Sequence, residues 1–499
     1  MAVVGGGMAG LGAAWALEGA RRGGAALEWD LYEREPRLGG KVLTVRHDGF
    51  VVEGGPDSAL AEKPWPIRLA HELGIGDRLL DANEDVRRSF VLWRGRLHEL
   101  PEGLVLTVPT RLLPFALSRL LSWRGKARVG LDLVLPRGAV ARAFRDGRAA
   151  ADPGLDESLA AFVRRRLGDE VLERIAEPIV AGVHAGDPER MSLRATFPLF
   201  LELEARHRSA VLGMVARRRA RQRAAPRPAA TGGQPRSYFY SFAGGLQDLV
   251  EALVAALPAA RLHAGLGVAR LAPGGEAGAP PGGRYALTLD DGRLTVVDAV
   301  VVATPAFAAA GLLRPLVPAA ASLLDRIGYV TTATVSLAWR AADVPHDLRG
   351  FGYVVPRVER RPVMATTWSS SKFAGRAPAG HVLLRSFLGR AGAEGPAELD
   401  DEEMVGVVRR ELRETMGVAA PPLFAHVFRW PRGMPQYEVG HLGLVARVEA
   451  EVARLPGLAL AGGAYHGIGI GDCLREGAAA ARRVLEAAGA VASGDGAGG

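Results

Sequence analysis

Short apolar runs, separated by glycine-rich turns and alanine-rich stretches, are the dominant pattern of the chain, and the first 33 residues show it clearly. The apolar run at residues 2–4 leads into three glycines, and residues 11–20 are rich in alanine and leucine. A second run at residues 28–32 has strand-forming side chains and ends at Glu33. This order predicts a strand, a glycine turn, a helix and a second strand.

The same pattern returns at the other end of the chain. Residues 457–461 form an apolar run that leads into two glycines, and residues 474–488 have the composition of a strong helix. The central part adds a helix and three strands, predicted at residues 247–257, 267–271, 285–289 and 294–302. Two glycine-rich helix starts at opposite ends of the chain predict one site that is assembled from both ends.

The first turn carries the motif G-x-G-x-x-G, in which Gly5, Gly7 and Gly10 occupy the glycine positions. In this motif the glycines permit a tight turn, a close approach of a pyrophosphate, and close packing of the helix on the strand. Glu33 stands about 20 residues further on, where an acid binds a ribose hydroxyl. The sequence therefore predicts a dinucleotide site, and the alternative for Glu33 is a solvated carboxylate at a strand end.

Composition narrows the class of protein. The chain has 499 residues and a single cysteine, Cys473, which excludes a disulfide framework and a cysteine-bound metal cluster, and we predict no metal site. We expect neither a signal peptide nor a membrane-spanning segment, and hence a cytoplasmic protein. The net charge is +8, and almost all of the positively charged residues are arginines. No nucleic-acid-binding motif accompanies this charge, so we expect no nucleic-acid partner.

Three further motifs carry a resemblance to a known family. E-x-x-x-R-x-G-G-K runs from Glu33 to Lys41, and the turn G-P-D-S follows at residues 55–58. Near the C-terminus, G-x-x-x-G-I-G-x-x-D-C runs from Gly463 to Cys473. Together they resemble the bacterial coproporphyrinogen III and protoporphyrinogen IX oxidases, members of the FAD-dependent amine oxidase superfamily. The resemblance implies that the dinucleotide is FAD.

The motif and the resemblance together define the predicted cofactor positions. Most of them are glycines or lie beside glycines in turns. They are Gly5, Gly6, Gly7, Met8, Ala9, Gly10, Glu33, Arg34, Gly39, Gly40, Lys41, Gly55, Pro56, Asp57, Ser58, Val268, Trp430, Gly463, Ile468, Gly469 and Ile470.

The resemblance implies an α/β fold within an α+β whole. Its parts are a Rossmann-like FAD-binding domain of the glutathione-reductase type, a substrate domain with an antiparallel sheet, and a helical domain. We predict FAD-binding segments at residues 1–63, 237–305 and 450–490, helices at 64–190, substrate-domain segments at 191–236 and 306–449, and a flexible tail at 491–499. Residues 332–339 are one predicted strand of the antiparallel sheet.

The implied activity is the six-electron oxidation of a porphyrinogen to a porphyrin in heme biosynthesis, with O2 as acceptor and H2O2 released. We prefer coproporphyrinogen III as substrate, with protoporphyrinogen IX as the alternative. No catalytic side chain is assigned, because the flavin N5 does the chemistry. Lys63, Arg87 and Arg88 are the predicted partners of the substrate carboxylates, and the alternative for Lys63 is a solvated helix residue.

Other functions share parts of this pattern. An amine oxidase and a carotenoid desaturase are the more distant enzymatic alternatives, and a Rab GDP-dissociation inhibitor is a non-enzymatic one. Residues 110–126 are apolar with spaced cations, which suits a helical cavity wall better than a membrane surface. We therefore expect a monomer or homodimer that binds a tetrapyrrole and O2, with peripheral membrane contact left open.

Overall fold

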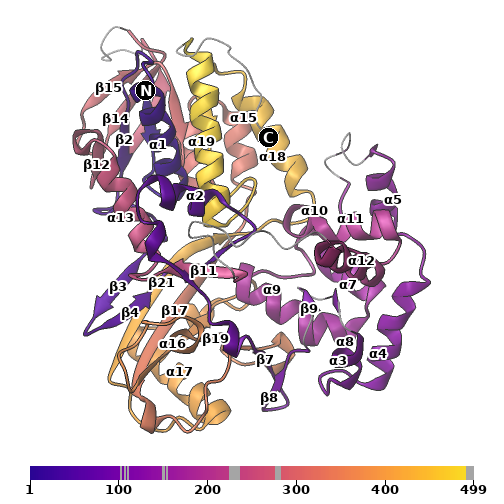
Figure 1. The fold of residues 1–499 in the computed structure, drawn as a ribbon. Helices are drawn as coiled ribbons and strands as arrows, with labels where there is room; N and C mark the ends of the chain where they lie inside the picture. The colour runs from indigo at the N-terminus through magenta and orange to yellow at the C-terminus, as the bar shows by residue number, and fades with distance from the viewer. Residues whose placement is uncertain are drawn as a thin grey trace.

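The computed structural model describes residues 1–499 except 102–103, 106–107, 110–111, 149–151, 153–154, 224–236, 276–281 and 490–499. Figure 1 shows three parts: a layered part that holds both the first and the last helix, a large sheet below it, and a group of helices beside the sheet. The expected tail at residues 491–499 lies outside the described residues.

A five-stranded parallel sheet forms the centre of the layered part. Its order is β12 (Leu262–Ala264), β2 (Asp30–Glu33), β1 (Ala2–Val4), β16 (Val300–Val302) and β22 (Leu458–Leu460). Ala2 pairs with both Asp30 and Val300, and Val300 pairs in turn with Leu458. The short apolar runs are buried on both faces, as is typical of parallel strands covered by helices. Strands from both ends of the chain therefore lie in one sheet.

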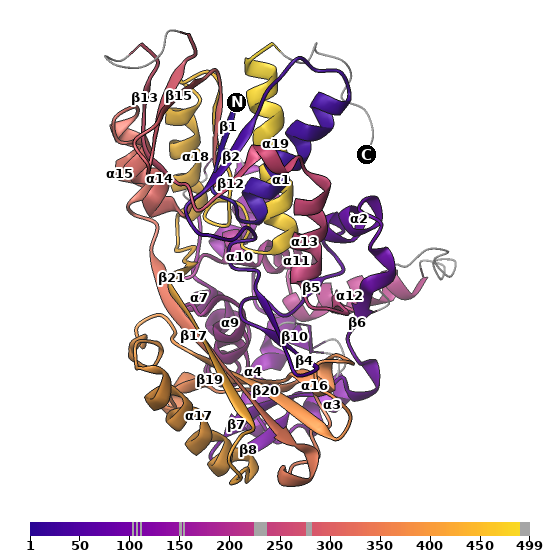
Figure 2. The ribbon, with the colours of Figure 1, turned by 90° about the vertical axis from the view of Figure 1, so that its left-hand side faces the viewer.

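Two helices from opposite ends of the chain pack against each other over this sheet. α1 (Met8–Arg22) and α19 (Ile470–Ala487) lie side by side in Figures 1 and 2. A Cβ added at Gly477 would lie 1.9 Å from the Ala9 carbonyl oxygen, and one at Gly12 would lie 2.7 Å from that of Leu474. The glycines therefore allow the two helix backbones to touch.

Further elements cover the remaining surfaces of the parallel sheet. α13 (Gln247–Ala256) packs beside α1, and a three-stranded antiparallel sheet packs near α14. These elements are β13 (Val268–Pro273), β14 (Tyr285–Leu289), β15 (Leu294–Val297), α14 (Ala306–Leu313), α15 (Pro318–Leu324) and α18 (His441–Val452). The predicted strand at residues 294–302 is two strands, because the chain turns at Asp298 and Ala299 between β15 and β16.

The second sheet has seven strands. Its order is β21 (Phe424–Pro435), β17 (Tyr329–Arg340), β20 (His381–Leu388), β19 (Val363–Trp368), β18 (Gly352–Val354), β7 (Ser89–Trp93) and β8 (Arg96–Glu99). The strands pair antiparallel except β7 with β18, which are parallel. α17 (Asp401–Met416) packs on one face through Met404, Val408 and Leu412.

The helical part differs from its predicted boundaries in two ways. β7 and β8 fall within residues 64–190 but belong to the seven-stranded sheet. The predicted substrate segment 191–236 contributes helices that pack with the helical part, because Phe200 and Leu201 share one core with Phe162 and Ile175. The helices are α3 (Leu112–Leu117), α4 (Trp123–Gly130), α5 (Ala139–Arg145), α7 (Leu159–Arg166), α8 (Asp169–Val171), α9 (Glu177–His184), α10 (Leu193–Thr196), α11 (Pro198–His207) and α12 (Ala210–Arg223).

Short elements connect the three parts. They are β3 (Thr44–His47), β4 (Phe50–Glu53), β5 (Ala59–Leu60), α2 (Trp65–Glu72), β6 (Leu79–Asp81), β9 (Leu104–Val105), β10 (Val108–Pro109), β11 (Phe239–Phe242) and α16 (Ser369–Lys372). Among the described residues, no helix combines the length and the apolar character that crossing a bilayer requires.

The contact between α1 and α19 generates a stability prediction. We expect Gly477→Ala to destabilise the protein by about 3 kcal/mol, because the added methyl must push two packed helices apart. Gly19→Ala is the control, since a Cβ there meets nothing within 4 Å. It should be neutral or stabilising by up to about 1 kcal/mol, from helix propensity alone. Urea unfolding of both variants measures this, and equal effects would contradict the packing argument.

Candidate functional site

The first glycine turn lies between β1 and α1. Gly5 has a φ of +105°, which only glycine adopts without strain, and its N–H donates to the Tyr32 carbonyl at 2.8 Å. A Cβ at Gly10 would lie 1.8 Å from the Gly5 carbonyl oxygen. The helix therefore begins in direct contact with the turn, and its first N–H groups point to the carboxyl end of the sheet. Met8 and Ala9, both buried, form the first helical residues.

Glu33 lies at the end of β2 and turns back toward the glycines. Its carboxylate accepts hydrogen bonds from the N–H groups of Gly6 at 2.5 Å and Glu35 at 2.9 Å. The second glycine turn rests on the first, because Gly39 N–H donates to the Gly6 carbonyl at 2.8 Å. A Cβ at Gly40 would lie 3.0 Å from the Gly7 Cα. The fold thus brings together the predicted residues from two separate motifs.

A third stretch joins the same edge of the sheet. Leu266 N–H donates to the Glu33 carbonyl at 2.9 Å, and Val268 follows as the buried first residue of β13. Arg34 is exposed and pairs with Asp290 at 3.1 Å. Glu33, Arg34 and Val268 are therefore neighbours, as the prediction of one site requires.

The C-terminal turn forms the start of α19. Gly469 precedes the helix, and its N–H donates to the Asp472 carboxylate at 3.2 Å. The Tyr437 hydroxyl donates to the Gly463 carbonyl and accepts from Gly467 N–H, each at 2.8 Å. Asp472 thus caps the start of α19, and the buried Tyr437 bridges the two ends of the glycine turn. Ile468 and Ile470 are half-buried in this turn.

The Gly55-Pro56-Asp57-Ser58 turn faces the seven-stranded sheet. The Gly54 carbonyl accepts from Trp430 Nε1 at 2.9 Å, from Thr334 Oγ1 at 3.2 Å and from Arg385 Nη2 at 3.3 Å. Three donors on one carbonyl fix the orientation of this peptide. Trp430, which the resemblance placed near the cofactor, thus holds the turn by its indole N–H.

Lys41 links this turn to the other two. A Cβ at Gly55 would lie 1.7 Å from the Lys41 carbonyl oxygen, so the two backbones are in contact. The Lys41 ammonium donates to the Gly433 carbonyl, and burial lowers its pKa. Cys473, in the first turn of α19, lies close enough to Lys41 to act on its charge, and burial raises the pKa of this thiol to about 12.

Charged side chains are buried behind the Gly54–Gly55 peptide. Lys372 Nζ lies 3.1 Å from both carboxylate oxygens of Asp57 and 3.1 Å from Ser58 Oγ. Burial would raise the pKa of Asp57, but the charges of Lys372 and Arg385 outweigh it and hold that pKa at about 2. For Glu53, burial prevails over the nearby Arg376 and raises the pKa to about 7.

The predicted substrate-binding cations lie in two different places. Lys63 is half-exposed and pairs with Asp472 at the start of α19, beside the glycine turn. His184 lies near it, and burial together with the Lys63 charge lowers the pKa of His184 to about 4. Arg87 pairs with Glu84 at 3.2 Å, and Arg88 pairs with Glu99 and stacks on Phe90. The structure therefore places Lys63, but not the two arginines, against the glycine turns.

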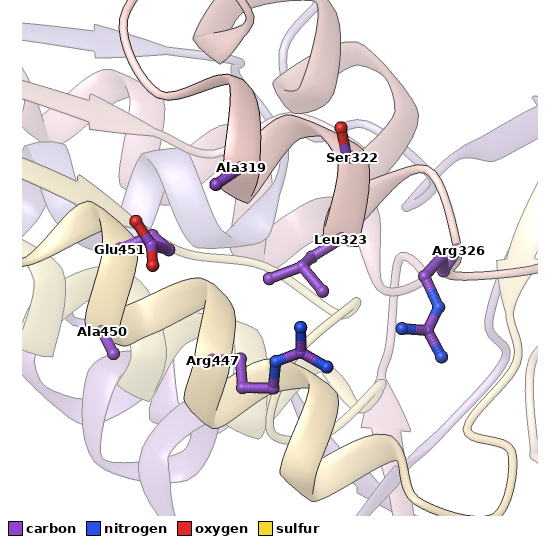
Figure 3. Close-up of a pocket in the computed structure, with 7 residues that line it drawn as sticks. All are labelled: Ala319, Ser322, Leu323, Arg326, Arg447, Ala450 and Glu451. Carbon is purple, nitrogen blue, oxygen red and sulfur yellow. The ribbon is translucent and has the colours of Figure 1, made fainter.

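A separate surface hollow lies outside this region. It has a volume of about 450 Å³ between α15 and α18 and is lined by Ala319, Ser322, Leu323, Arg326, Arg447, Ala450 and Glu451 (Figure 3). Its lining mixes two alanines and a leucine with a serine, two arginines and a glutamate, and it contains none of the predicted site residues. We assign it no part in the chemistry.

The converging turns fit an extended dinucleotide. A Cβ at Gly5, Gly10, Gly40 or Gly55 would meet neighbouring backbone, so these glycines allow the turns to pack closely together. Thr304, two residues after the end of β16, has a buried hydroxyl without a partner among the described residues, next to Gly5. Such a hydroxyl at the carboxyl end of a parallel sheet suits a phosphate or ribose oxygen.

Comparison with known proteins identifies the family. Residues 8–485 match the flavin-containing amine oxidoreductases, and the chain belongs to this family. It is 35% identical to the coproporphyrinogen III oxidase of Bacillus subtilis over 97% of both chains. It is 38% identical to that of Propionibacterium freudenreichii, over 98% of this chain and 91% of the relative. The chloroplastic protoporphyrinogen oxidase 1 of Arabidopsis thaliana is 33% identical, with 95% and 85% covered.

Solved structures agree with this assignment. A provisionally assigned protoporphyrinogen oxidase from Exiguobacterium has a TM-score of 0.80 and 31% identity, over 97% of this chain and 98% of the other. A putrescine oxidase has a TM-score of 0.67 at 16% identity, which shows the shared fold alone. The predicted family and fold class are confirmed. The protein is an FAD-dependent oxidoreductase.

Some residues of the site were not predicted from the sequence. Thr304, Thr334, Lys372, Arg385 and Tyr437 all contact or adjoin the turns. A charge in the middle of the apolar strand that contains Arg385 was an available signal. Thr304, two residues after an apolar strand, was another.

Glu33 generates a prediction about cofactor affinity. We expect Glu33→Ala to weaken FAD binding about 10- to 100-fold, because it removes a charged acceptor that also orders the glycine turn. Glu35→Ala, which removes an exposed carboxylate two residues away, should change the dissociation constant less than about twofold. Titration of the deflavinated proteins with FAD, followed by flavin fluorescence, measures both. Equal weakening in the two variants would contradict the role of Glu33.

Proposed function

We propose that the protein oxidises coproporphyrinogen III to coproporphyrin III, as the relatives from Bacillus subtilis and Propionibacterium freudenreichii are named for doing. The observation that carries the proposal is the likeness to these enzymes over at least 91% of both chains. The relatives named protoporphyrinogen oxidase are 30–33% identical; the plant ones are covered over 78–85% of their length and the bovine one over 98%. Protoporphyrinogen IX is therefore the second candidate substrate.

The reaction removes six electrons from the substrate and passes them to oxygen. FAD held by the glycine turns would supply two-electron chemistry, so three cycles would convert three O2 to three H2O2 and one porphyrinogen to one porphyrin. The product is aromatic, which supplies the driving force. The side chains therefore have to bind and orient the substrate and hold the cofactor.

Lys63 supports the preference for the tetracarboxylate. Its ammonium has three donors, of which the Asp472 carboxylate engages one, and the side chain is half-exposed. It therefore has donors free for a substrate carboxylate beside the start of α19. Coproporphyrinogen III carries four carboxylates and protoporphyrinogen IX carries two, so a cation here favours the former.

An amine oxidase with this fold is a weaker proposal. Lys372 is the one lysine of the described residues between Lys126 and the C-terminal turn, and it is held by Asp57 and Ser58. Its ammonium also lies over the rings of Phe239 and Phe373. It is thus engaged in the buried charge cluster, which argues against a free lysine that serves amine oxidation.

A substrate prediction tests the proposal. Aerobic assays should show faster porphyrin formation from coproporphyrinogen III than from protoporphyrinogen IX. Lys63→Gln should raise KM for the tetracarboxylate about tenfold, the loss of one charge-assisted hydrogen bond, with less effect on the dicarboxylate. Arg68→Gln, at an exposed position of α2, is the matched control and should leave both KM values unchanged. Faster turnover of protoporphyrinogen IX, or equal KM effects, would overturn the substrate preference.

We further propose a cytoplasmic protein that contacts membranes peripherally through α3 and α4. Leu117 and Trp123 are each 73% exposed, while Phe115 and Val129 on the same segments are buried in the helical core. Residues 112–131 contain no acidic residue. Exposed apolar tips among cations suit an anionic lipid surface. The segment therefore combines side chains packed in the helical core with an exposed apolar surface.

Vesicle binding tests this surface. Trp123→Ser should reduce co-sedimentation with phosphatidylserine-containing vesicles about threefold or more, since one exposed indole is removed from the apolar tip. Leu423→Ser is the control, because Leu423 is 49% exposed but lies next to β21. No binding by the unaltered protein, or equal loss in both variants, would exclude this mode of contact. Sedimentation of the free protein separately checks the prediction of a monomer or homodimer.

A further inference from the structure

Arg385 is a buried cation in the middle of β20. The residue is 2% exposed, and its cross-strand neighbours are Ser336 on β17 and Thr367 on β19. Neither neighbour carries a charge. Burying a guanidinium in such a place is unfavourable unless other groups compensate it.

The guanidinium of Arg385 has no hydrogen-bonded carboxylate among the described residues. Nη2 donates to the carbonyls of Gly54 and Gly55, but Nε and Nη1 have no hydrogen-bond partner among the described residues. Asp57 is close enough to influence it, yet the carboxylate of Asp57 is bonded to Lys372 and Ser58 instead. The guanidinium of Arg385 therefore points at the Gly54–Gly55 peptide.

The carboxylates around Arg385 are bonded to other groups. Arg376, Arg385 and Lys372 lie around Glu53 and Asp57, and a third carboxylate, Asp248, acts on Arg376 but is bonded to Arg46. Glu53 accepts from Thr44 Oγ1 at 2.6 Å and from Leu246 N–H at 2.9 Å, and Arg376 lies 3.8 Å from it. Lys372 and Arg376 are thus paired with carboxylates, whereas Arg385 is the cation of this cluster without a bonded carboxylate among the described residues. In a buried site that charge is poorly screened by solvent.

This charge lies behind the place where the turns converge. Gly54 and Gly55, which Arg385 holds, contact Trp430 and the backbone of Lys41, and Lys41 in turn adjoins Cys473 in the first turn of α19. We propose that Arg385 is a positioning residue that orients the Gly54–Gly55 peptide and keeps a fixed positive charge behind it, which favours reduced FAD over oxidised FAD. The inference depends on FAD and not on the porphyrinogen proposed above.

Two variants separate charge from hydrogen bonding. Arg385→Gln keeps a donor for the Gly55 carbonyl without the charge, whereas Arg385→Lys keeps both. In the FAD-loaded proteins we expect Arg385→Gln to lower the midpoint potential and to weaken sulfite binding about tenfold, as for the loss of one poorly screened charge. Arg385→Lys should stay within about twofold of the unaltered protein in sulfite affinity. Neither measurement uses a porphyrinogen.

Arg390→Gln is the matched control. Arg390 is also buried and follows the same strand, but it bonds to Glu177 and to the Val355 carbonyl, away from the turn. Its loss should reduce stability and leave the potential and sulfite affinity unchanged. The proposal is overturned if the Gln and Lys variants of Arg385 shift together, if neither shifts, or if Arg390→Gln shifts as much. It is also overturned if Arg385→Gln fails to hold FAD while Arg385→Lys holds it, because Arg385 then serves folding.

Discussion

Contact between the backbones of α1 and α19 is the constraint on which the rest of the structure depends. Gly12 and Gly477 remove the side chains that would keep these helices apart, and the helices start at the two ends of the chain. Because β1, β16 and β22 pair in one parallel sheet beneath them, both glycine turns open at the same edge. A site for an extended dinucleotide follows from this packing, with no need for a long binding loop.

The two sheets meet at the Gly54–Ser58 turn, and this junction is electrostatic as well as steric. The Gly54 carbonyl accepts three donors from the seven-stranded sheet, and Lys372 binds Asp57 from α16. Such a junction keeps the turn at a fixed distance from the seven-stranded sheet. The opposite side of the turn faces the start of α19. The buried charges are costly for folding, so their contribution is to orientation and local potential more than to stability.

Charges of opposite sign also lie together at the start of α19. The helix N-terminus favours negative charge, and the Asp472 carboxylate already satisfies part of that preference. Lys63 restores positive charge beside it, and the neighbouring His184 stays neutral because its pKa is low. Lys63 and Asp472 therefore compensate each other's charge at the start of the helix.

Much of this arrangement was predictable from local sequence. Glycine spacing and the position of Glu33 identified the dinucleotide turn, because backbone conformation and close approach depend on residues only a few positions apart. The resemblance added the turns at Gly40, Gly55 and Gly469. Boundaries between the parts were less predictable: β7 joins β18, and residues 193–223 join the helices, through apolar contacts that no local pattern specifies.

The sequence by itself determined that both ends of the chain carry strand–glycine–helix units. It also determined, through the glycine motif and Glu33, that the first unit binds a dinucleotide. Only the tertiary structure decided that Arg385 and Lys372 lie behind Gly55, and that Arg87 and Arg88 pair with nearby acids away from the turns. The physical reason is that neighbouring residues determine the local conformation of the backbone. Compensation of charge, by contrast, depends on strands and helices that are hundreds of residues apart.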